Sequence, residues 1–258
     1  MTALISTLVF FAVVTYVVLH SPNWAAVKHQ FLDAAIFKSS FPLILRAFWT
    51  NVVAFMVGEV FILLLALILA VMRSLRGPVF FPIRALSVIY VDLFRGIPTI
   101  LVIFLLGFGI PGLQIPGVPT SEFFWGVVSL VLVYSAYVAE VYRAGIESVH
   151  ESQISAARSL GLSRWQSMRH VVLPQAVRRV IPPLLNDFIG LQKDTALLAL
   201  IGVLEAFRIS GLEVSRTFNY TPYLACALIF IAITIPLARF TDYLIARGRR
   251  RRMAGGAG

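Results

Sequence analysis

Six long apolar stretches dominate this chain, and each is long enough to cross a lipid bilayer. A transmembrane helix needs about 20 mostly apolar residues. The stretches lie at about 2–19, 52–72, 85–108, 123–142, 180–204 and 222–245. This pattern predicts an all-α membrane protein with about six transmembrane helices.

Composition also favours a membrane protein over a soluble one. Hydrophobic residues make up 59% of the 258 residues and charged residues 13%, whereas soluble domains have about 45–50% and about 25%. Such a high hydrophobic content also argues against disorder. The single cysteine, Cys226, lies in an apolar stretch, so an intrachain disulfide and a cysteine-based metal site are excluded.

The first apolar stretch has no charge through Leu19 and is predicted to be a retained membrane helix. Its apolar run exceeds the roughly 7–15 residues of a signal-peptide core, and it lacks the basic segment and cleavage site of such a peptide. Thr221-Pro222 has the pattern of a helix N-cap followed by proline and is predicted to open the last span. Ser21-Pro22 is a candidate start for an interfacial helix before Phe41.

Basic residues predict the orientation of the chain, because Lys and Arg concentrate in cytoplasmic loops. Fourteen of the 22 basic residues lie in the segments 73–84, 143–179 and 246–258, and five lie in the loops of the other side. The side with 14 charges is therefore predicted to be cytoplasmic and to hold both termini. The basic run Arg249–Arg252 suits contact with anionic lipid, and no nucleic acid partner is predicted.

The segment at about 143–179 is long for a membrane loop and has a helical pattern. Ser148-Val-His-Glu151 and Ser163-Arg-Trp-Gln166 both have capping-box spacing, and Gly161 between them stands where a helix would end on a left-handed residue. Two short cytoplasmic helices are therefore predicted to meet at a turn. Ala156 and Ala157 form a patch of small side chains that would let another protein approach closely. The alternative is an interfacial hairpin without a partner.

Several motifs resemble those of permease subunits of ATP-binding-cassette importers, in the subgroup for polar amino acids. ISAARSLG at 154–161 and VLPQA at 172–176 resemble the cytoplasmic coupling loop of that family. FRGIP at 94–98, AYVAEVYR at 136–143 and LQKDT at 191–195 resemble further motifs of the subgroup, in the same order. The resemblance covers about 41–245 and is specific because the motifs occur together.

The resemblance implies the type I permease fold of these importers. It implies a permease core at 41–245 with a coupling loop at about 148–173. An additional N-terminal transmembrane helix and extracytoplasmic linker at 1–40 precede the core, and a basic cytoplasmic tail at 246–258 follows it. The chain is then expected in the inner membrane of a bacterial cell, in direct contact with the lipid bilayer.

The resemblance also implies partners: an ATPase subunit, a second permease that is the same or homologous, and an extracytoplasmic solute-binding protein. The sequence has no G-x-x-x-x-G-K-[ST] phosphate-binding loop. ATP and Mg²⁺ are therefore expected on the partner ATPase. The chain itself is expected to be non-catalytic and to bind no cofactor or metal.

The resemblance assigns one group of residues to contact with the ATPase. These residues are Ser155, Ala156, Ala157, Gly161, Leu173 and Pro174. The family's loop glutamate falls on Ser155, and its usual glycine falls on Ser152. Weaker coupling, compensation by Glu151, or a partner permease that retains the glutamate would each account for this departure.

A second group is expected to form the translocation path or its gate, because ionisable groups at membrane depth are costly and are often functional. Its members are Asp92, Arg95, Gly96, Pro98, Glu140, Lys193, Asp194 and Thr195. Asp92 and Arg95 are three residues apart on one helix and can therefore pair, and Pro98 is expected to break the helix there. Lys193 and Asp194 are adjacent, so each is expected to have a partner elsewhere.

Glu59 lies in the middle of the stretch 52–72 and belongs to no motif of the family. One interpretation is a carboxylate in the path that attracts a cationic amino acid. The other is a protonated or paired glutamate against a neighbouring helix.

The sequence therefore favours a permease subunit of an ATP-driven importer for polar or charged amino acids. The alternative is an ion-coupled secondary transporter or channel that uses Asp92, Glu140 and Lys193 as a relay. That class needs no docking hairpin and often has inverted repeats, and none is found in the sequence. A membrane-embedded enzyme is disfavoured because no nucleophile–base set is convincing.

Overall fold

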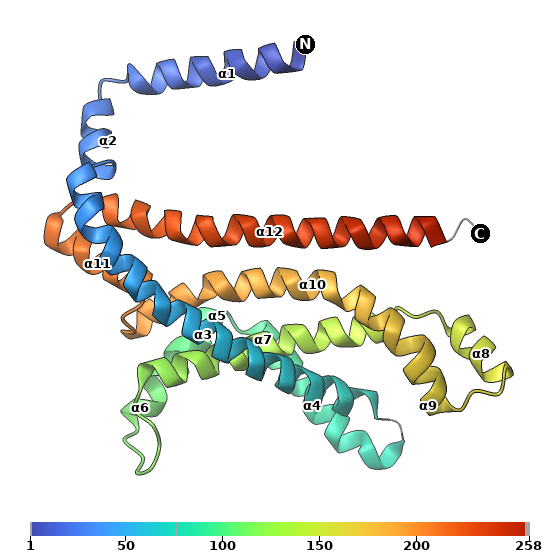
Figure 1. Cartoon of the computed structure of the whole chain (residues 1–258). Coiled ribbons are helices and arrows are strands. Elements are labelled where there is room, and N and C mark those ends of the chain that lie inside the picture. Colours follow the sequence, from blue (N-terminus) through green and yellow to red (C-terminus); the bar gives the residue numbers. More distant parts are fainter. Residues whose placement is uncertain (1, 76, 256–258) are drawn as a thin grey trace.

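The structure is a computed structural model that describes residues 2–75 and 77–255, and within these ranges it contains helices and no strand (Figure 1). The first helices are α1 (Thr2–Leu19), α2 (Trp24–Phe31), α3 (Ala34–Ser74), the 3-10 turn η1 (Pro78–Phe80) and α4 (Phe81–Gly96). They are followed by α5 (Thr99–Phe104), the π-helical turn η2 (Leu105–Gly109), α6 (Ile110–Gly112), α7 (Glu122–Glu147), α8 (Glu151–Ser159) and α9 (Arg164–Ser167). The last are the π-helical turn η3 (Met168–Val172), α10 (Leu173–Asp194), the 3-10 segment η4 (Thr195–Ile201), α11 (Ala206–Thr217) and α12 (Thr221–Gly255).

Three helical segments of the described chain are each long and apolar enough to cross a membrane, namely Trp24–Ser74, which joins α2 and α3, Glu122–Glu147 and Thr221–Arg247. Two bent pairs raise the number to five if each pair is one span. Helix α1 is apolar over Leu4–Leu19 but is shorter than these spans. The all-α membrane architecture is therefore confirmed, whereas the count of six spans is not.

The first bent pair replaces the continuous span expected at 85–108. The helices Pro78–Gly96 and Thr99–Gly112 meet at 102°. Between them Ile97 is extended, with φ −94° and ψ 131°, because a residue before proline is driven out of the helical region. The expected break at Pro98 is confirmed, and it turns one predicted span into two helices.

The second bent pair lies at the end of the stretch expected at 180–204. The helical run Arg164–Ile201 and the helix Ala206–Thr217 meet at 50°. Gly202 ends the first run with φ 98°, a conformation that glycine adopts without the penalty of a Cβ atom. Glu205 then begins α11 as its N-cap. The helical run begins well before residue 180, and the sequence did not anticipate the bend at its end.

Glycines allow α7 and η2 to pack closely against α10 and η4. A Cβ atom on Gly126 would lie 2.5 Å from Leu198 Cδ2, and one on Gly107 would lie 2.7 Å from Ile201 Cδ1. A Cβ on Gly145 of α7 would overlap the Val180 side chain of α10. Around these contacts lies the main core, which includes the fully buried Leu130 and Leu191.

A second core joins the first half of α3 to α11 and α12, with Ile44, Ala206 and Cys226 among its buried residues. Helix α12 begins at Thr221, as expected. The Oγ1 atom of Thr221 accepts a hydrogen bond of 3.1 Å from the backbone nitrogen of Asp33. Asp33 in turn caps α3 with its side chain. These contacts fix the start of α3 against the start of α12.

The N-terminal helices lie outside both cores. Helix α1 runs apart from the others (Figure 1), and its described side chains are exposed. Helix α2 begins at Trp24 after Asn23, slightly later than the start suggested at Ser21-Pro22. The basic tail expected at 246–258 continues α12 as far as Gly255, and 256–258 lie outside the described residues.

We expect the substitution Gly145→Ala to lower the free energy of unfolding of the purified protein by about 1–3 kcal/mol, because its methyl group must displace Val180 in a packed interface. Gly58→Ala is the matched control, since a Cβ on that buried helical glycine has no neighbour within 4 Å. Thermal unfolding in detergent measures both. Equal melting temperatures for the two variants would show that α7 and α10 are not packed as described.

Candidate functional site

Helices α8 and α9 form a hairpin, here called the arm (residues 151–167), at the end of the molecule away from α2 and α11 (Figure 1). Helix α8 ends at a left-handed Gly161 with φ 86°, and the Leu162 nitrogen donates to the Ala157 carbonyl at 3.2 Å, the pattern of a Schellman motif. Ser163 and Gln166 cap α9 reciprocally. The turn at Gly161 and the second capping box are therefore both confirmed.

The start of the arm differs from the prediction. His150, and not Ser148, is the N-cap of α8, and its Nδ1 accepts a hydrogen bond of 3.3 Å from the Ser152 nitrogen. Ser148 ends α7, where its hydroxyl donates to the Gly145 carbonyl at 2.6 Å. The spacing of the first capping box therefore did not identify the cap.

The arm presents an exposed surface with both small and large apolar side chains. Ser155, Ala156 and Gly161 are exposed, and Leu160 and Trp165 are 84% and 70% exposed. Ala157 is only 5% exposed. The expectation that both alanines form a contact patch is therefore wrong for Ala157, which packs against its own chain. Leu173 and Pro174, also expected at this surface, are exposed at the start of α10.

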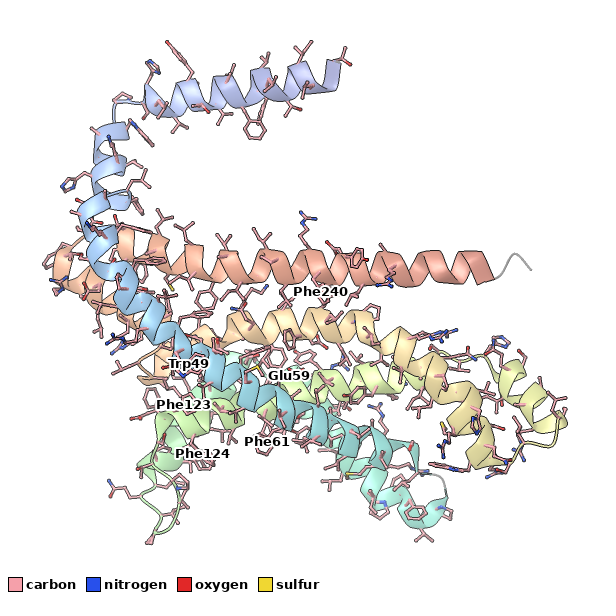
Figure 2. The ribbon with its side chains drawn as sticks, viewed as in Figure 1. Trp49, Glu59, Phe61, Phe123, Phe124 and Phe240 are labelled. Atoms are coloured by element: carbon pink, nitrogen blue, oxygen red, sulfur yellow. The ribbon has the colours of Figure 1, made fainter. Side chains whose placement is uncertain are left out.

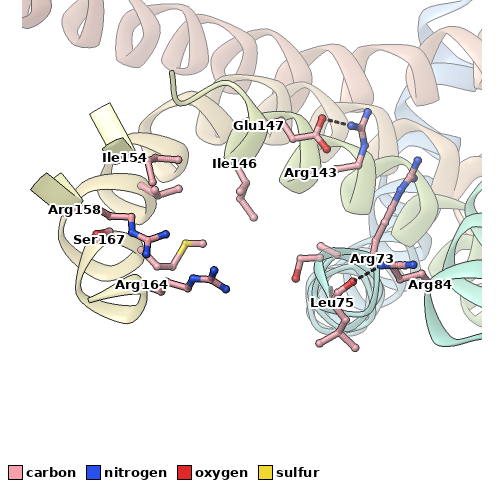
Figure 3. Close-up of a pocket in the computed structure, with 14 residues that line it drawn as sticks. Arg73, Leu75, Arg84, Arg143, Ile146, Glu147, Ile154, Arg158, Arg164 and Ser167 are labelled. Carbon is pink, nitrogen blue, oxygen red and sulfur yellow. Dashed lines mark hydrogen bonds and ion pairs between the residues drawn. The ribbon is translucent and has the colours of Figure 1, made fainter. Parts of the chain in front are cut away.

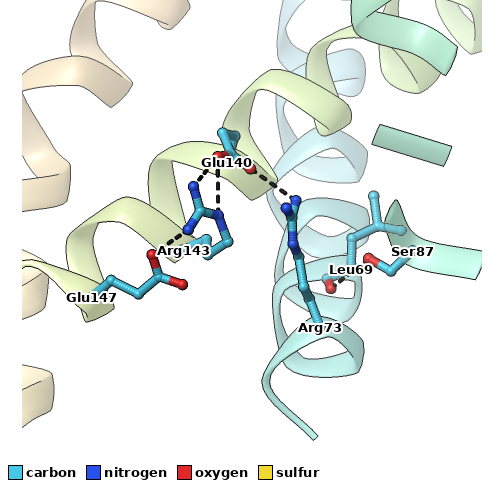
Figure 4. Close-up of polar contacts among 6 residues, drawn as sticks. All are labelled: Leu69, Arg73, Ser87, Glu140, Arg143 and Glu147. Carbon is cyan, nitrogen blue, oxygen red and sulfur yellow. Dashed lines mark hydrogen bonds and ion pairs between the residues drawn. The ribbon is translucent and has the colours of Figure 1, made fainter. Parts of the chain in front are cut away.

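An ion bridge joins α3 to α7 near the arm (Figure 4). The Arg73 guanidinium donates to Glu140 Oε2 at 2.9 Å, and Arg143 donates to Glu140 Oε1 through Nε at 3.0 Å. Arg143 also pairs with Glu147. Only 21% of the Glu140 side chain is exposed. Glu140 thus holds two helices together, and the sequence placed Arg73 and Arg143 in loops without linking them to it.

A cavity of about 360 Å³ lies beside this bridge and contains charges of both signs. Arg95, Glu140 and Asp187 contribute to its lining. The Arg95 guanidinium lies over the Tyr137 ring, 5.7 Å from its centre. Asp187 Oδ2 is buried and has no hydrogen-bond partner among the described residues.

The possible pair of Asp92 with Arg95 does not form in the structure. Asp92 is exposed on α4, and within the described chain no ion pair includes it. A separation of three residues allows two side chains to meet but does not require it. Gly96 and Pro98 lie at the first helix break, as expected.

Thr195 belongs to a buried polar network at the second helix break. Asn51 of α3 donates to Thr195 Oγ1 at 3.1 Å and to Glu205 Oε2 at 2.8 Å. Glu205 also accepts from the backbone nitrogens of Phe207 and Arg208 at 2.9 and 2.7 Å. Thr195 and Glu205 have no exposed surface, and Asn51 is 2% exposed.

Sequence reasoning missed Asn51 and Glu205, which adjoin the ends of the stretches 52–72 and 180–204. The available signal was a polar residue directly beside an apolar stretch, together with Gly202 as a helix terminator.

Thr195 also borders a mostly apolar cavity of about 400 Å³ between α3, α10 and α12.

The remaining predicted path residues lie apart from one another. Asp194 accepts a hydrogen bond of 2.9 Å from the Tyr134 hydroxyl, whereas Lys193 is exposed and lines a different cavity with Phe207 and Tyr223. The partner expected for Asp194 is therefore present, whereas within the described chain the Lys193 side chain has no hydrogen-bond or ion-pair partner. Glu59 is half-buried in the middle of α3 (Figure 2), and its carboxylate is near enough to Asp187 to interact electrostatically.

The fold and these features define a polytopic helical membrane protein with broken spans and an external helical arm. Residues 62–250 match the family model described as the binding-protein-dependent transport system inner membrane component. The chain therefore belongs to this family, whose members are permease subunits of ABC transporters and are not themselves catalytic.

Relatives and solved structures agree with this assignment. The chain is 35% identical over 219 residues to the probable glutamine ABC transporter permease protein GlnM of Bacillus subtilis, covering 84% of this chain and 98% of that protein. It is 37% identical to the probable amino-acid ABC transporter permease protein PatM of Vibrio harveyi, covering 77% and 88%.

Among solved structures, the crystal structure of an amino acid ABC transporter with histidines matches with a TM-score of 0.68 and 30% identity, covering 83% of this chain and 94% of that one. The MetNI methionine ABC transporter, at 18% identity and a TM-score of 0.63 over 80% and 96% of the chains, shares the fold. The protein is thus an amino-acid ABC importer permease and a multi-pass protein of the bacterial inner membrane.

We expect Asn51→Leu to lower the free energy of unfolding by about 2–4 kcal/mol, because the buried Ala206 nitrogen loses its acceptor and Glu205 and Thr195 each lose one hydrogen bond. Thr50→Val is the matched polar-to-apolar control, since Thr50 makes only a long bond of 3.4 Å at the surface. Denaturation in detergent compares the two. A loss no larger than that of the control would contradict the network's role.

We expect Glu140→Gln to destabilise the contact of α3 with α7 by about 1–3 kcal/mol, because two guanidinium groups lose their shared carboxylate. Glu147→Gln removes a carboxylate that contacts the same Arg143 but is 61% exposed, so its effect should be below about 1 kcal/mol. The rate of amino-acid uptake by the assembled transporter and the melting temperature of the protein should both fall for Glu140→Gln, and neither should fall for Glu147→Gln. If the two variants had the same melting temperature and the same uptake, the ion bridge would not be a stabilising contact between α3 and α7.

Proposed function

We propose that this chain is the transmembrane permease subunit of an ATP-driven importer for polar or charged amino acids. It forms the translocation path together with a second permease, the same or homologous, and couples that path to a separate ATPase. The observation that carries the proposal is the arm, which projects beyond the packed helices and exposes Leu160 and Trp165. Exposed large apolar side chains beside small ones favour a protein partner.

The connection between the arm and the membrane helices supports coupling. From Arg164 to Ile201 the chain is one helical run through α9, η3, α10 and η4. A displacement of the arm would therefore act directly on α10 and on Thr195, which is bonded to Asn51 of α3. In this proposal ATP and Mg²⁺ bind to the ATPase subunit, and ATP binding shifts the equilibrium between two arrangements of the helices.

The ATPase contacts in this proposal are Ser155, Ala156, Gly161, Leu173 and Pro174, with Leu160 and Trp165 added from the structure. The arm lies on the cytoplasmic side, together with both termini. The basic loops support this orientation, and Figure 1 shows the end of α12 on the same side as α8 and α9, with the start of α1 pointing toward that side. An extracytoplasmic solute-binding protein delivers the substrate from the opposite side.

The cavity lined by Arg95, Glu140 and Asp187 supports a substrate with charges of both signs. An amino acid carries an ammonium group and a carboxylate, and groups of opposite charge at the wall would replace part of the hydration that each loses on entry. We place Arg95 and Glu140 on the path on this basis. Gly96 and Pro98 shape the break nearby, while Thr195 belongs to the second break.

Disulfide or bifunctional crosslinking tests the docking of the ATPase. In a background with Cys226→Ala, we expect Ala156→Cys to crosslink to a cysteine in the co-expressed ATPase subunit, because residue 156 is exposed on α8. Ala157→Cys is the matched control on the next residue and should crosslink at most weakly, since Ala157 is buried.

Uptake by the same preparations separates the two functional classes. We expect uptake to require the ATPase and ATP. Uptake by the chain alone, driven by an ion gradient, would contradict the proposal and favour a secondary transporter. The absence of crosslinks at positions 155, 156 and 160 would also contradict the proposal.

A further inference from the structure

A basic cavity of about 640 Å³ separates the arm from the ends of α3, α4 and α7 (Figure 3). Its charged lining residues are five arginines and one acid, namely Arg73, Arg84, Arg143, Arg158, Arg164 and Glu147. Figure 3 shows Arg158 and Arg164 of the arm on one side of the cavity, with Arg73 and Arg84 on the other. The cavity thus gathers positive charge from five separate helices, α3, α4, α7, α8 and α9.

The arginines differ in how far their charge is already compensated. Arg73 and Arg143 share Glu140, and Arg84 donates to the Leu75 carbonyl at 3.1 Å. The guanidinium groups of Arg158 and Arg164 have no hydrogen-bond or ion-pair partner among the described residues. Two guanidinium groups at the cavity wall are therefore free to bind an anion.

Ser167 supplies an independent indication of a ligand. Its side chain lines the same cavity, the residue is 2% exposed, and its hydroxyl has no hydrogen-bond partner in the described chain. A buried hydroxyl without a partner is costly, and most such groups in proteins are satisfied. An anionic oxygen in the cavity would accept the hydrogen bond that Ser167 cannot make within the protein.

Apart from Ser74, the rest of the lining is apolar and includes Ala70, Leu75 and Ile146, at the ends of long apolar helices. Arginine is well suited to phosphate because its planar group can donate two parallel hydrogen bonds. Basic cavities between transmembrane helices on the cytoplasmic side suit anionic lipid head groups. We propose that this cavity binds a phosphate group, and that the phosphate belongs to an anionic phospholipid whose apolar part lies against the helix ends.

Such a ligand would connect the arm to the spans. A phosphate held by Arg158, Arg164 and Ser167 would fill the space between the arm and α3. The binding site itself follows from the cavity alone. Only its consequence, a dependence of transport on anionic lipid, rests on the proposed function.

Lipid retention by the purified transporter complex, measured by native mass spectrometry, tests the proposal. The probes are phosphatidylglycerol, phosphatidylcholine and inorganic phosphate, each titrated separately. We expect phosphatidylglycerol to be retained by the unmodified protein and at least about tenfold more weakly by Arg158→Gln/Arg164→Gln, since each arginine near an anionic head group adds to its binding. The matched control Arg169→Gln/Arg178→Gln removes two exposed arginines of the same segment that do not line the cavity, and it should bind as the unmodified protein does.

Ser167→Ala provides a second variant with little risk to folding, and we expect weaker retention together with unchanged thermal stability of the lipid-free complex. Equal retention by the double variant and its control would overturn the proposal, as would equal retention of phosphatidylglycerol and phosphatidylcholine. Binding of inorganic phosphate without binding of phosphatidylglycerol would overturn the lipid as the source of the phosphate. Failure of the complex to retain either phosphatidylglycerol or inorganic phosphate would also overturn it. None of these outcomes depends on transport, so the proposed function is tested separately.

Discussion

The structure depends on one constraint: backbone groups released by a helix break within a membrane must find hydrogen-bond partners inside the protein. Two spans of this chain are broken, at Ile97-Pro98 and at Gly202–Glu205. At the second break, Glu205 binds the free nitrogens at the start of α11, and Asn51 binds both Glu205 and the Ala206 nitrogen. This capping lets the chain change direction without leaving polar groups exposed to lipid, and it ties the break to α3.

The same constraint explains how a small hairpin can act on distant helices. The arm continues as one helical run into α10 and η4, which end at the second break. On the other side, Glu140 connects α7 to the end of α3 through Arg73. Helix α3 therefore meets the polar network through Asn51 and the ion bridge through Arg73. In the proposed function, movement of the arm would be transmitted through packed helices and these two polar connections, because close-packed interiors shift as units and do not deform freely.

Much of this architecture could be predicted from the sequence because long apolar stretches, Pro98, Gly161 and the Ser163 capping box act locally. The motifs also identified the family, which the comparisons confirmed. Contacts between distant segments could not be predicted in this way. The pair of Asp92 with Arg95 did not form, Ala157 proved buried, and His150 replaced Ser148 as a cap. Asn51 and Glu205 were missed because each lies just outside an apolar stretch, and only the folded chain brings them together.

The most direct test of this account is the distance between the arm and α3 in the complete transporter. Spin labels at Ser155→Cys and Trp49→Cys, both exposed positions, can be placed in a Cys226→Ala background and measured by pulsed electron resonance in the nucleotide-free and ATP-bound states. The account predicts that ATP changes the distance distribution as the arm moves relative to the start of α3. An identical distribution in the two states, in a preparation that still transports, would contradict it.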